Sequence, residues 1–380
     1  MTMAHGEVGS TVGQALSSSA APMVGQFDLV VLDLDGVVYI GPDAVPGAAD
    51  AIAATGRLGV RSCFLTNNAS RTPDQVADHL VELAVPATPD DVVTSAQVAA
   101  GLLAERLPEG SRVLVVGGLG LRVALIGAGL VPVDTMADRP AAVVQGFSPD
   151  ITWRLLAEGT HAVRSGLLWV ASNLDLTVPT PNGPAPGNGS LVQVVATAAG
   201  RGPDLVAGKP QPQPFRAAAQ RYGSERPLVV GDRLDTDIEG GCAAGMPGLA
   251  VLTGVCGASD LLLAPAGMRP AFLGRDLGAL VEGHPEVQVA PMAGDGAVRA
   301  RCNAAVVDAS GAGVGSGRLR IGEPGADPLD LLRAGCAAAW AWADRSRAAP
   351  ATPGHAGGQL ELTAVLAALT ALDPGLTWAR

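Results

Sequence analysis

The sequence of 380 residues contains few aromatic side chains, a single lysine and few cysteines. Phe, Trp and Tyr together make up 3% of the residues, so any hydrophobic core must be built mainly from aliphatic side chains. The five cysteines are widely spaced and form no CxxC motif, and the five histidines show no HxxxH spacing. These absences argue against a disulfide framework and a zinc site, and they fit a cytoplasmic protein.

Long apolar runs and excess positive charge are also missing. No stretch of 18 purely apolar residues is present, so we expect no membrane-spanning helix. Residues 1–25 contain neither Lys nor Arg and are rich in Ser, Gly and Ala, which predicts a disordered tail rather than a signal peptide. With 25 Lys and Arg against 36 Asp and Glu, the net charge of −11 disfavours nucleic acid and anionic membranes as partners.

Lys209 is the only lysine among these 25 cationic residues. One explanation is a genome-wide preference for Arg codons that left one lysine by chance. The other is a site whose chemistry requires a lysine. Composition alone does not choose between them.

Alternating strand and helix patterns predict an α/β fold with a doubly wound, Rossmann-like core. Apolar runs typical of strands in a buried parallel sheet occur at Phe27–Leu34, Val60–Thr66, Leu205–Ala207, Arg226–Gly231 and Leu249–Leu252. The first two are followed by segments with helical spacing, Gly47–Gly56 and Thr72–Leu83. We therefore expect parallel strands whose carboxyl ends share one edge of the sheet.

The same patterns divide the chain into parts. After the tail of residues 1–25, we assign residues 26–94 and 192–283 to the core. Residues 95–191 interrupt the core with their own helices and strands, which predicts an inserted α/β cap domain. Residues 284–380 combine alternating strands with two Ala- and Leu-rich helices and are predicted to form a small C-terminal α/β domain.

Acidic residues stand where two of the predicted core strands end. Asp33 and Asp35 end the first strand, and their spacing turns both carboxylates to the same side of an extended chain. Asp232 ends a later strand. Ligands of open α/β sheets bind at the carboxyl ends of the strands, so we expect the three acids to meet there. Carboxylates without imidazole are ligands that suit Mg²⁺.

Neutral and cationic donors follow other predicted strands. Thr66 and Asn67 end the second strand, and Lys209 stands in a Gly-Lys-Pro sequence. Hydroxyl, amide and ammonium groups can donate hydrogen bonds to a phosphoryl group. Acids, metal ligands and such donors at one sheet edge predict phosphoryl-transfer chemistry on a small phosphorylated metabolite.

Four motifs of the chain resemble those of the haloacid dehalogenase (HAD) superfamily. They are Asp33-Leu34-Asp35-Gly36, Thr66-Asn67-Asn68, Gly208-Lys209-Pro210 and the segment GDRLDTDI from Gly231 to Ile238. The resemblance covers Phe27–Leu280 and is to the subclass IIA phosphatases, which carry an α/β cap between the second and third motifs. With its added C-terminal domain, the chain is similar to bacterial glycerol 3-phosphate phosphatases, with phosphoglycolate and 4-nitrophenyl phosphate phosphatases as close relatives.

This resemblance implies a role for each motif residue. Asp33 would attack phosphorus and form an aspartyl phosphate, and Asp35 would act as general acid and then general base. Mg²⁺ would be held by the carboxylates of Asp33 and Asp232 and the main-chain carbonyl of Asp35. The phosphoryl oxygens would be bound by Thr66, Asn67 and Lys209. Supporting roles would fall to Gly36, at the turn after the acids, to Asn68, and to Asp237, which would orient Lys209 or a water.

Two polar residues of the predicted cap, Asn173 and Asp175, follow the apolar run LLWVAS. Two interpretations are open for them. They face the substrate, or they are polar groups satisfied within a loop.

The sequence thus predicts a Mg²⁺-dependent phosphomonoester hydrolase, with glycerol 3-phosphate as the expected substrate because the cap shows no basic cluster for a charged leaving group. Phosphoglycolate or another small ester is the alternative substrate. A phosphomutase would use the same nucleophile but usually has a helical cap. A non-enzymatic phospho-acceptor module would have adjacent acids. The oligomeric state and the role of the C-terminal domain stay open.

Overall fold

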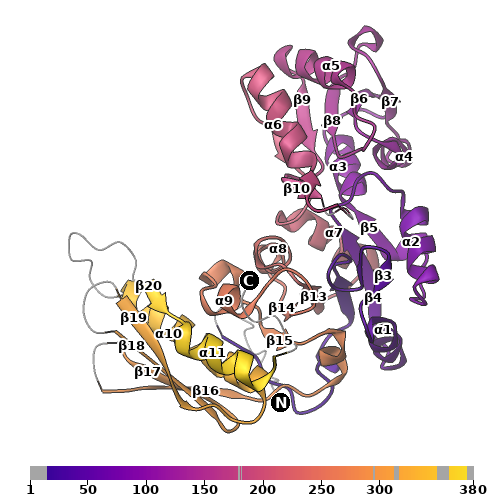
Figure 1. Ribbon diagram of the computed structural model, residues 1–380. Coiled ribbons are helices and arrows are strands. Elements are labelled where there is room, and N and C mark those ends of the chain that lie inside the picture. Colours follow the sequence, from indigo (N-terminus) through magenta and orange to yellow (C-terminus); the bar gives the residue numbers. More distant parts are fainter. Residues whose placement is uncertain are drawn as a thin grey trace, which may run out of the picture. The chain divides into compact units, whose positions relative to one another are not determined.

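The computed structural model describes residues 15–178, 180, 182–293, 296–311, 316–348 and 359–374. The chain forms two compact units, one of residues 27–227 and the other of residues 1–26 and 228–380. We call them the 27–227 unit and the 228–380 unit. Both contain parallel strands connected by helices, which confirms the expected α/β class (Figure 1).

The core sheet of the 27–227 unit has three parallel strands in the order β1–β4–β5. These strands are β1 (Leu29–Leu32), β4 (Arg61–Thr66) and β5 (Val92–Thr94). Helices α1 (Ala48–Arg57) and α2 (Pro73–Glu82) lie between them in the chain. α2 begins where the sequence predicts, because Thr72 accepts a hydrogen bond from Gln75 N and the Gln75 side chain accepts one from Thr72 N.

The cap of the same unit is a five-stranded parallel sheet with helices on both faces (Figure 1). The sheet order is β12–β9–β8–β6–β7, with β6 at Arg112–Val116, β7 at Val131–Val133, β8 at Ala142–Gln145, β9 at Leu168–Ala171 and β12 at Leu205–Val206. Two hydrophobic clusters hold it together. One contains α3 (Ser95–Ala104) and α4 (Leu119–Gly127), and the other α5 (Trp153–Arg164) and α6 (Asn188–Ala199).

The cap extends further along the chain than the sequence predicted. Strand β12 and most of α6 fall in the segment 192–283 that was assigned to the core. Leu205 of β12 pairs with Val170 of β9, and Val192 and Val195 of α6 are buried in a cap cluster. A two-residue strand carries too little pattern to indicate which sheet it joins. The chain returns to the core at α7 (Pro212–Tyr222), which packs against β1, β4 and β5.

The 228–380 unit contains two sheets. The first has parallel strands β13 (Pro227–Gly231), β14 (Gly248–Val251) and β15 (Phe272–Gly274). The second has the order β16–β17–β18–β19–β20 and is antiparallel except for the parallel pair β19–β20. Its strands are β16 (Val287–Pro291), β17 (Val298–Cys302), β18 (Ala305–Gly311), β19 (Ser316–Glu323) and β20 (Gln359–Glu361), with helices α10 (Pro328–Ala348) and α11 (Thr363–Leu372).

One hydrophobic cluster joins the two parts of this unit. It contains side chains of residues 234–273 as well as side chains of β17, β18, β19 and α10. The indole of Trp340 on α10 donates a 2.8 Å hydrogen bond to the carbonyl of Leu261 on α9 (Ala258–Leu262). The segment from residue 284 therefore shares its core with the strands before it, whereas the sequence suggested a domain of its own.

Residues 15–26 are ordered on the 228–380 unit. Met23 and Val24 are fully buried, Ser17 N donates to Ala271 O at 2.7 Å, and Ser19 forms a β-bridge with His284. The prediction of a disordered tail is wrong for residues 15–25, because two buried apolar side chains and backbone pairing outweigh the polar composition around them. Residues 1–14 lie outside the described part of the chain.

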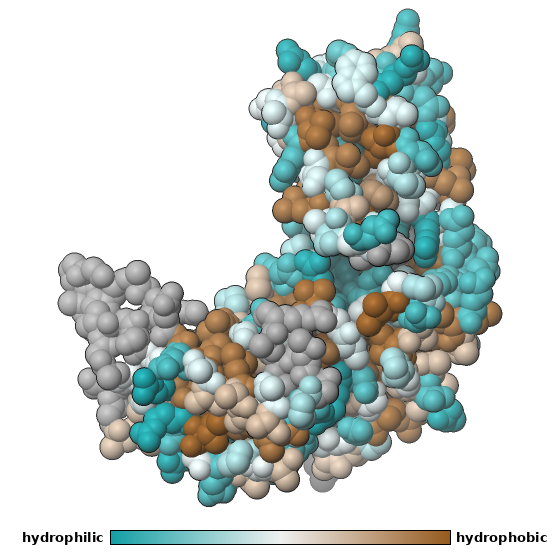
Figure 2. All heavy atoms as spheres, in the orientation of Figure 1, coloured by the Kyte–Doolittle hydropathy of each residue, from teal (hydrophilic) through white to brown (hydrophobic). Residues whose placement is uncertain are grey.

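Within the described residues, no helix combines the length and the apolar character needed to cross a membrane. Some large apolar side chains do reach the surface of the cap, among them Trp153 and Ile126. Figure 2 shows hydrophobic residues grouped on the cap surface in this view.

Candidate active site

Asp33 and Asp35 follow the fully buried strand β1, as the sequence predicts. The chain turns directly after them, since Val38 N donates to Leu34 O at 2.9 Å. Gly36 has a φ of 85°, a conformation that residues with a Cβ rarely adopt, so glycine is required at this turn. The turn leaves both aspartates at the carboxyl end of the strand.

Lys209 lies directly on Asp33. Its ammonium group donates a hydrogen bond of 2.6 Å to Asp33 Oδ1, and the two side chains are only 5% and 11% exposed. The attraction between opposite charges is stronger where water is excluded, and here it offsets the cost of removing both charges from water. The position supports the second explanation for the single lysine, a site that requires it.

Asp35 differs from Asp33 in its electrostatic surroundings. Asp35 is exposed, but the surrounding protein removes part of the water that would hydrate its carboxylate. The negative charge of Asp33 also repels that of Asp35. Together these effects raise the pKa of Asp35 to about 6. Lys209, Arg71 and His79 act in the opposite direction but do not cancel the rise. A carboxyl group with a pKa near 6 can both give and accept a proton near neutral pH.

Thr66 and Asn68 stand at the end of β4 as predicted. Thr66 is buried, and its Oγ1 accepts a hydrogen bond from Asn68 N at 3.0 Å while its hydroxyl hydrogen stays available. Asn68 Oδ1 accepts hydrogen bonds from Ser70 N and Ser70 Oγ, both at 2.8 Å. Asn68 therefore fixes the loop that leads into α2.

Asn67 was expected to bind phosphate. In the structure its side-chain amide bonds to the backbone of Lys209 and to Asp175 of the cap. Asn173 is buried and donates a 2.7 Å hydrogen bond to Asn67 O. The polar groups of Asn173 and Asp175 are thus bonded to the protein, which favours the second interpretation given for them.

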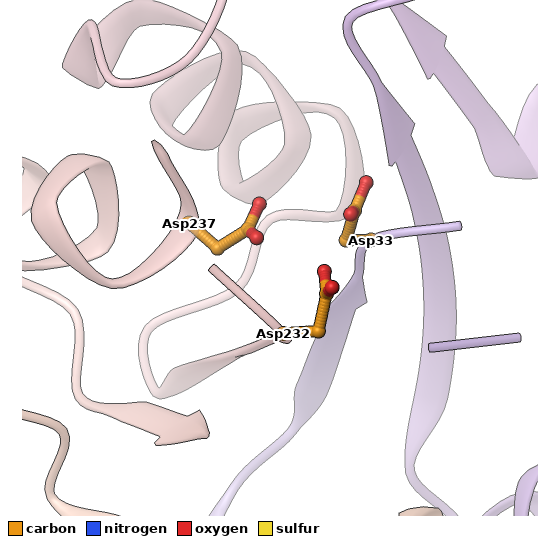
Figure 3. A group of neighbouring side chains, drawn as sticks. All are labelled: Asp33, Asp232 and Asp237. Atoms are coloured by element: carbon orange, nitrogen blue, oxygen red, sulfur yellow. The ribbon is translucent and has the colours of Figure 1, made fainter. Parts of the chain in front are cut away.

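Asp232 and Asp237 of the 228–380 unit follow β13. Both are 1% exposed, and an oxygen of one lies within 4.8 Å of an oxygen of the other. Val255 N donates to Asp232 at 2.7 Å, and Arg233 N donates to Asp237 at 3.2 Å. Among the described residues, the group suited to hold a metal ion consists of these two and Asp33 (Figure 3). Asp237, expected only in a supporting role, thus belongs to this group.

Ser95 is a residue that the sequence analysis missed. Its hydroxyl donates a 2.7 Å hydrogen bond to Asn67 O, and the side chain is 1% exposed. It follows β5, so the rule that led to Thr66, namely polar residues at the ends of parallel strands, would have found it.

Comparison with known proteins identifies the family. Residues 30–131 match haloacid dehalogenase-like hydrolases, and residues 206–280 match a second family of that type. D-glycerol 3-phosphate phosphatase of Mycobacterium tuberculosis is 48% identical over 269 residues, which cover 71% of this chain and 75% of that protein. The chain belongs to the haloacid dehalogenase-like hydrolases.

Other members of this family that resemble the chain are also named phosphatases. Acid sugar phosphatase of Staphylococcus aureus is 37% identical over 238 residues, which cover 62% of this chain and 90% of that protein. These names confirm the expected enzyme class, phosphatase.

Solved structures show similarity over almost the whole length of this chain. The glycerol phosphate phosphatase of Mycobacterium tuberculosis in complex with magnesium has a TM-score of 0.77 at 40% identity, covering 93% of this chain and 99% of that one. The 4-nitrophenylphosphatase of Thermotoga maritima has a TM-score of 0.63 at 31% identity, covering 68% and 98%. The expected HAD fold is therefore confirmed.

Proposed function

We propose that this chain is a Mg²⁺-dependent phosphatase that hydrolyses a small phosphate monoester through an aspartyl phosphate on Asp33, with glycerol 3-phosphate as its substrate. The observation that carries the proposal is the arrangement after β1. The Lys209 ammonium lies 2.6 Å from Asp33, and the pKa of Asp35, two residues further, is raised to about 6. Nucleophile, phosphate-binding cation and proton donor thus stand together.

In the first step, a carboxylate oxygen of Asp33 forms a bond to phosphorus while the bond from phosphorus to the alcohol oxygen breaks. Protonated Asp35 gives its proton to the departing oxygen, so the alcohol leaves neutral. Lys209 and the Thr66 hydroxyl would donate hydrogen bonds to the phosphoryl oxygens. Asn67 would contribute by holding Lys209 with its side-chain amide.

In the second step, ionised Asp35 takes a proton from water, and the hydroxide attacks the aspartyl phosphate. The bond between phosphorus and Asp33 breaks, inorganic phosphate leaves, and both aspartates return to their starting states. A pKa near 6 lets Asp35 exchange a proton in both steps without a large driving force in either direction.

The residues present fit a magnesium ion. The candidate ligands are carboxylates without sulfur or imidazole, the donor set that Mg²⁺ prefers. We assign the ion to Asp33 and Asp232, with the main-chain carbonyl of Asp35 as expected from the sequence and with Asp237 beside it. When bound, the ion would neutralise negative charge between the nucleophile and the phosphate.

The substrate assignment rests on similarity and on the cap. The relative that is 48% identical is named for D-glycerol 3-phosphate. The cap sequence shows no basic cluster that would bind a carboxylate or a second phosphate of the leaving group. A neutral polyol is the leaving group that suits such a site.

Phosphate release from a panel of esters tests the proposal. We expect a higher kcat/KM for glycerol 3-phosphate than for phosphoglycolate, sugar bisphosphates or nucleotides, and no activity after removal of Mg²⁺. A tenfold advantage of phosphoglycolate or a nucleotide, about 1.4 kcal/mol, would overturn the substrate assignment but not the phosphatase class. Transfer of the phosphoryl group to another position of the substrate without phosphate release would instead indicate a phosphomutase.

A further inference from the structure

The side chain of Asn67 holds the backbone of Lys209 at two points. Asn67 Oδ1 accepts a hydrogen bond of 2.8 Å from Lys209 N, and Asn67 Nδ2 donates one of 3.2 Å to Lys209 O. A Cβ at Gly208 would lie 2.6 Å from Asn67 Oδ1, so glycine permits this close approach. The amide therefore fixes the residue whose ammonium group binds Asp33.

Asp175 of the cap completes the hydrogen bonding of this amide. Its Oδ2 accepts the other Nδ2 hydrogen of Asn67 at 3.0 Å. A carboxylate only accepts hydrogen bonds, so a rotation of the amide by half a turn would place Asn67 Oδ1 against Asp175 and against Lys209 O. Asp175 thus reinforces the amide orientation that the backbone N–H and C=O of Lys209 also require.

The backbone of Asn67 is held independently of Asp175. Asn67 O accepts hydrogen bonds from Asn173 Nδ2 and from Ser95 Oγ, both at 2.7 Å. Removal of the Asp175 carboxylate would therefore take one of three hydrogen bonds from the amide of Asn67 and loosen it, without releasing its backbone. This separation makes the role of Asp175 testable.

We propose that Asp175 is a positioning residue for the catalytic lysine, acting through the side-chain amide of Asn67. The inference rests on the proposed function, because it assigns Lys209 to the phosphoryl group. Docking of this cap segment on Asn67 thereby completes the phosphate site. Loss of Asp175 should weaken the binding of the phosphoryl group, whichever alcohol the ester carries.

Two esters with different leaving groups test this. In Asp175→Ala, we expect kcat/KM for glycerol 3-phosphate and for 4-nitrophenyl phosphate to fall by the same factor, about tenfold, and inorganic phosphate to inhibit more weakly by a similar factor. Asp175→Asn should recover part of the loss, since its side-chain oxygen can still accept from Asn67. A loss confined to glycerol 3-phosphate would overturn the proposal, because it would place Asp175 on the leaving group.

A double-mutant cycle tests the route through Asn67. Asn67→Ala should lower kcat/KM by at least as much as Asp175→Ala, and the double variant should be no slower than Asn67→Ala alone. Asp134→Asn, which removes a cap carboxylate that pairs with Arg122, serves as a control and should keep parental activity. Additive losses in the cycle would overturn the proposal. Failure of the parent protein to release phosphate from either ester would instead count against the proposed function itself.

Discussion

The ammonium group of Lys209 donates a 2.6 Å hydrogen bond to Asp33, a residue 176 positions earlier in the chain. Both side chains are nearly inaccessible to water. The pair joins the end of a core strand to a loop that the chain reaches only after it has built the cap. Each partner can therefore be tested by a substitution that keeps one property and changes another: Lys209→Arg keeps the charge and changes the shape, and Asp33→Asn keeps the shape and removes the charge.

Lys209→Arg should lower kcat/KM by about 100-fold, although the rest of the chain uses Arg for its cations. The guanidinium group is planar and broad, and the space beside Asp33 holds a compact ammonium group at 5% exposure. Steady-state kinetics on glycerol 3-phosphate checks this. Arg57→Lys, on the exposed end of α1, is the matched control and should be neutral. Near-parental activity of Lys209→Arg would favour the other explanation, that a preference for Arg codons left this one lysine by chance.

Asp33→Asn should abolish turnover, with a loss on the order of 10³-fold or more, because an amide of the same shape is a poor nucleophile. Circular dichroism and thermal unfolding would show that the fold is kept. If the pure, folded variant retained most of its activity, a covalent intermediate on Asp33 could not be part of the mechanism.

Asp232→Asn should raise the Mg²⁺ concentration needed for half-maximal activity by about tenfold, since one anionic oxygen ligand is lost. EDTA should inactivate the parent protein reversibly. Asp235→Asn provides a control from the same motif, because Asp235 is exposed and pairs with Arg233. Equal Mg²⁺ requirements of the parent and the Asp232 variant would show that this carboxylate binds no metal.

Asp35→Asn should stabilise the metal-free protein above pH 6. The pKa of Asp35 is raised to about 6, so between about pH 4 and pH 6 the native state binds more protons than the unfolded chain, and stability falls as pH rises. The amide of the Asn variant carries no charge, so the variant does not lose stability in this way as the pH rises. In EDTA, the gain in Tm should be larger at about pH 7.5 than at about pH 5.

Asp43→Asn, on the exposed strand β3 (Asp43–Ala44), is the control for this experiment and should show no such gain. An Asp35 variant whose Tm difference from the parent is the same at both pH values would contradict the raised pKa.

The local sequence determined much of the fold and of the candidate site of this protein. The buried runs before Asp33 and Thr66 predicted strands, because a parallel sheet covered on both faces needs continuous apolar residues. The acids and donors after these runs predicted the chemistry, because parallel strands bring their carboxyl ends to one edge. The four motifs identified the superfamily that the comparisons confirm.

Tertiary structure decided what depends on contacts between distant segments. The short strand β12 joins the cap sheet, and Met23 and Val24 are buried on the 228–380 unit, although neither segment has a local pattern that indicates its partner. The amide of Asn67 could have faced a phosphate. Folding places Lys209 and Asp175 on either side of it, and hydrogen-bond geometry then leaves its two polar atoms one arrangement. Such a choice follows from three segments meeting in space, which residue types and spacing along the chain do not encode.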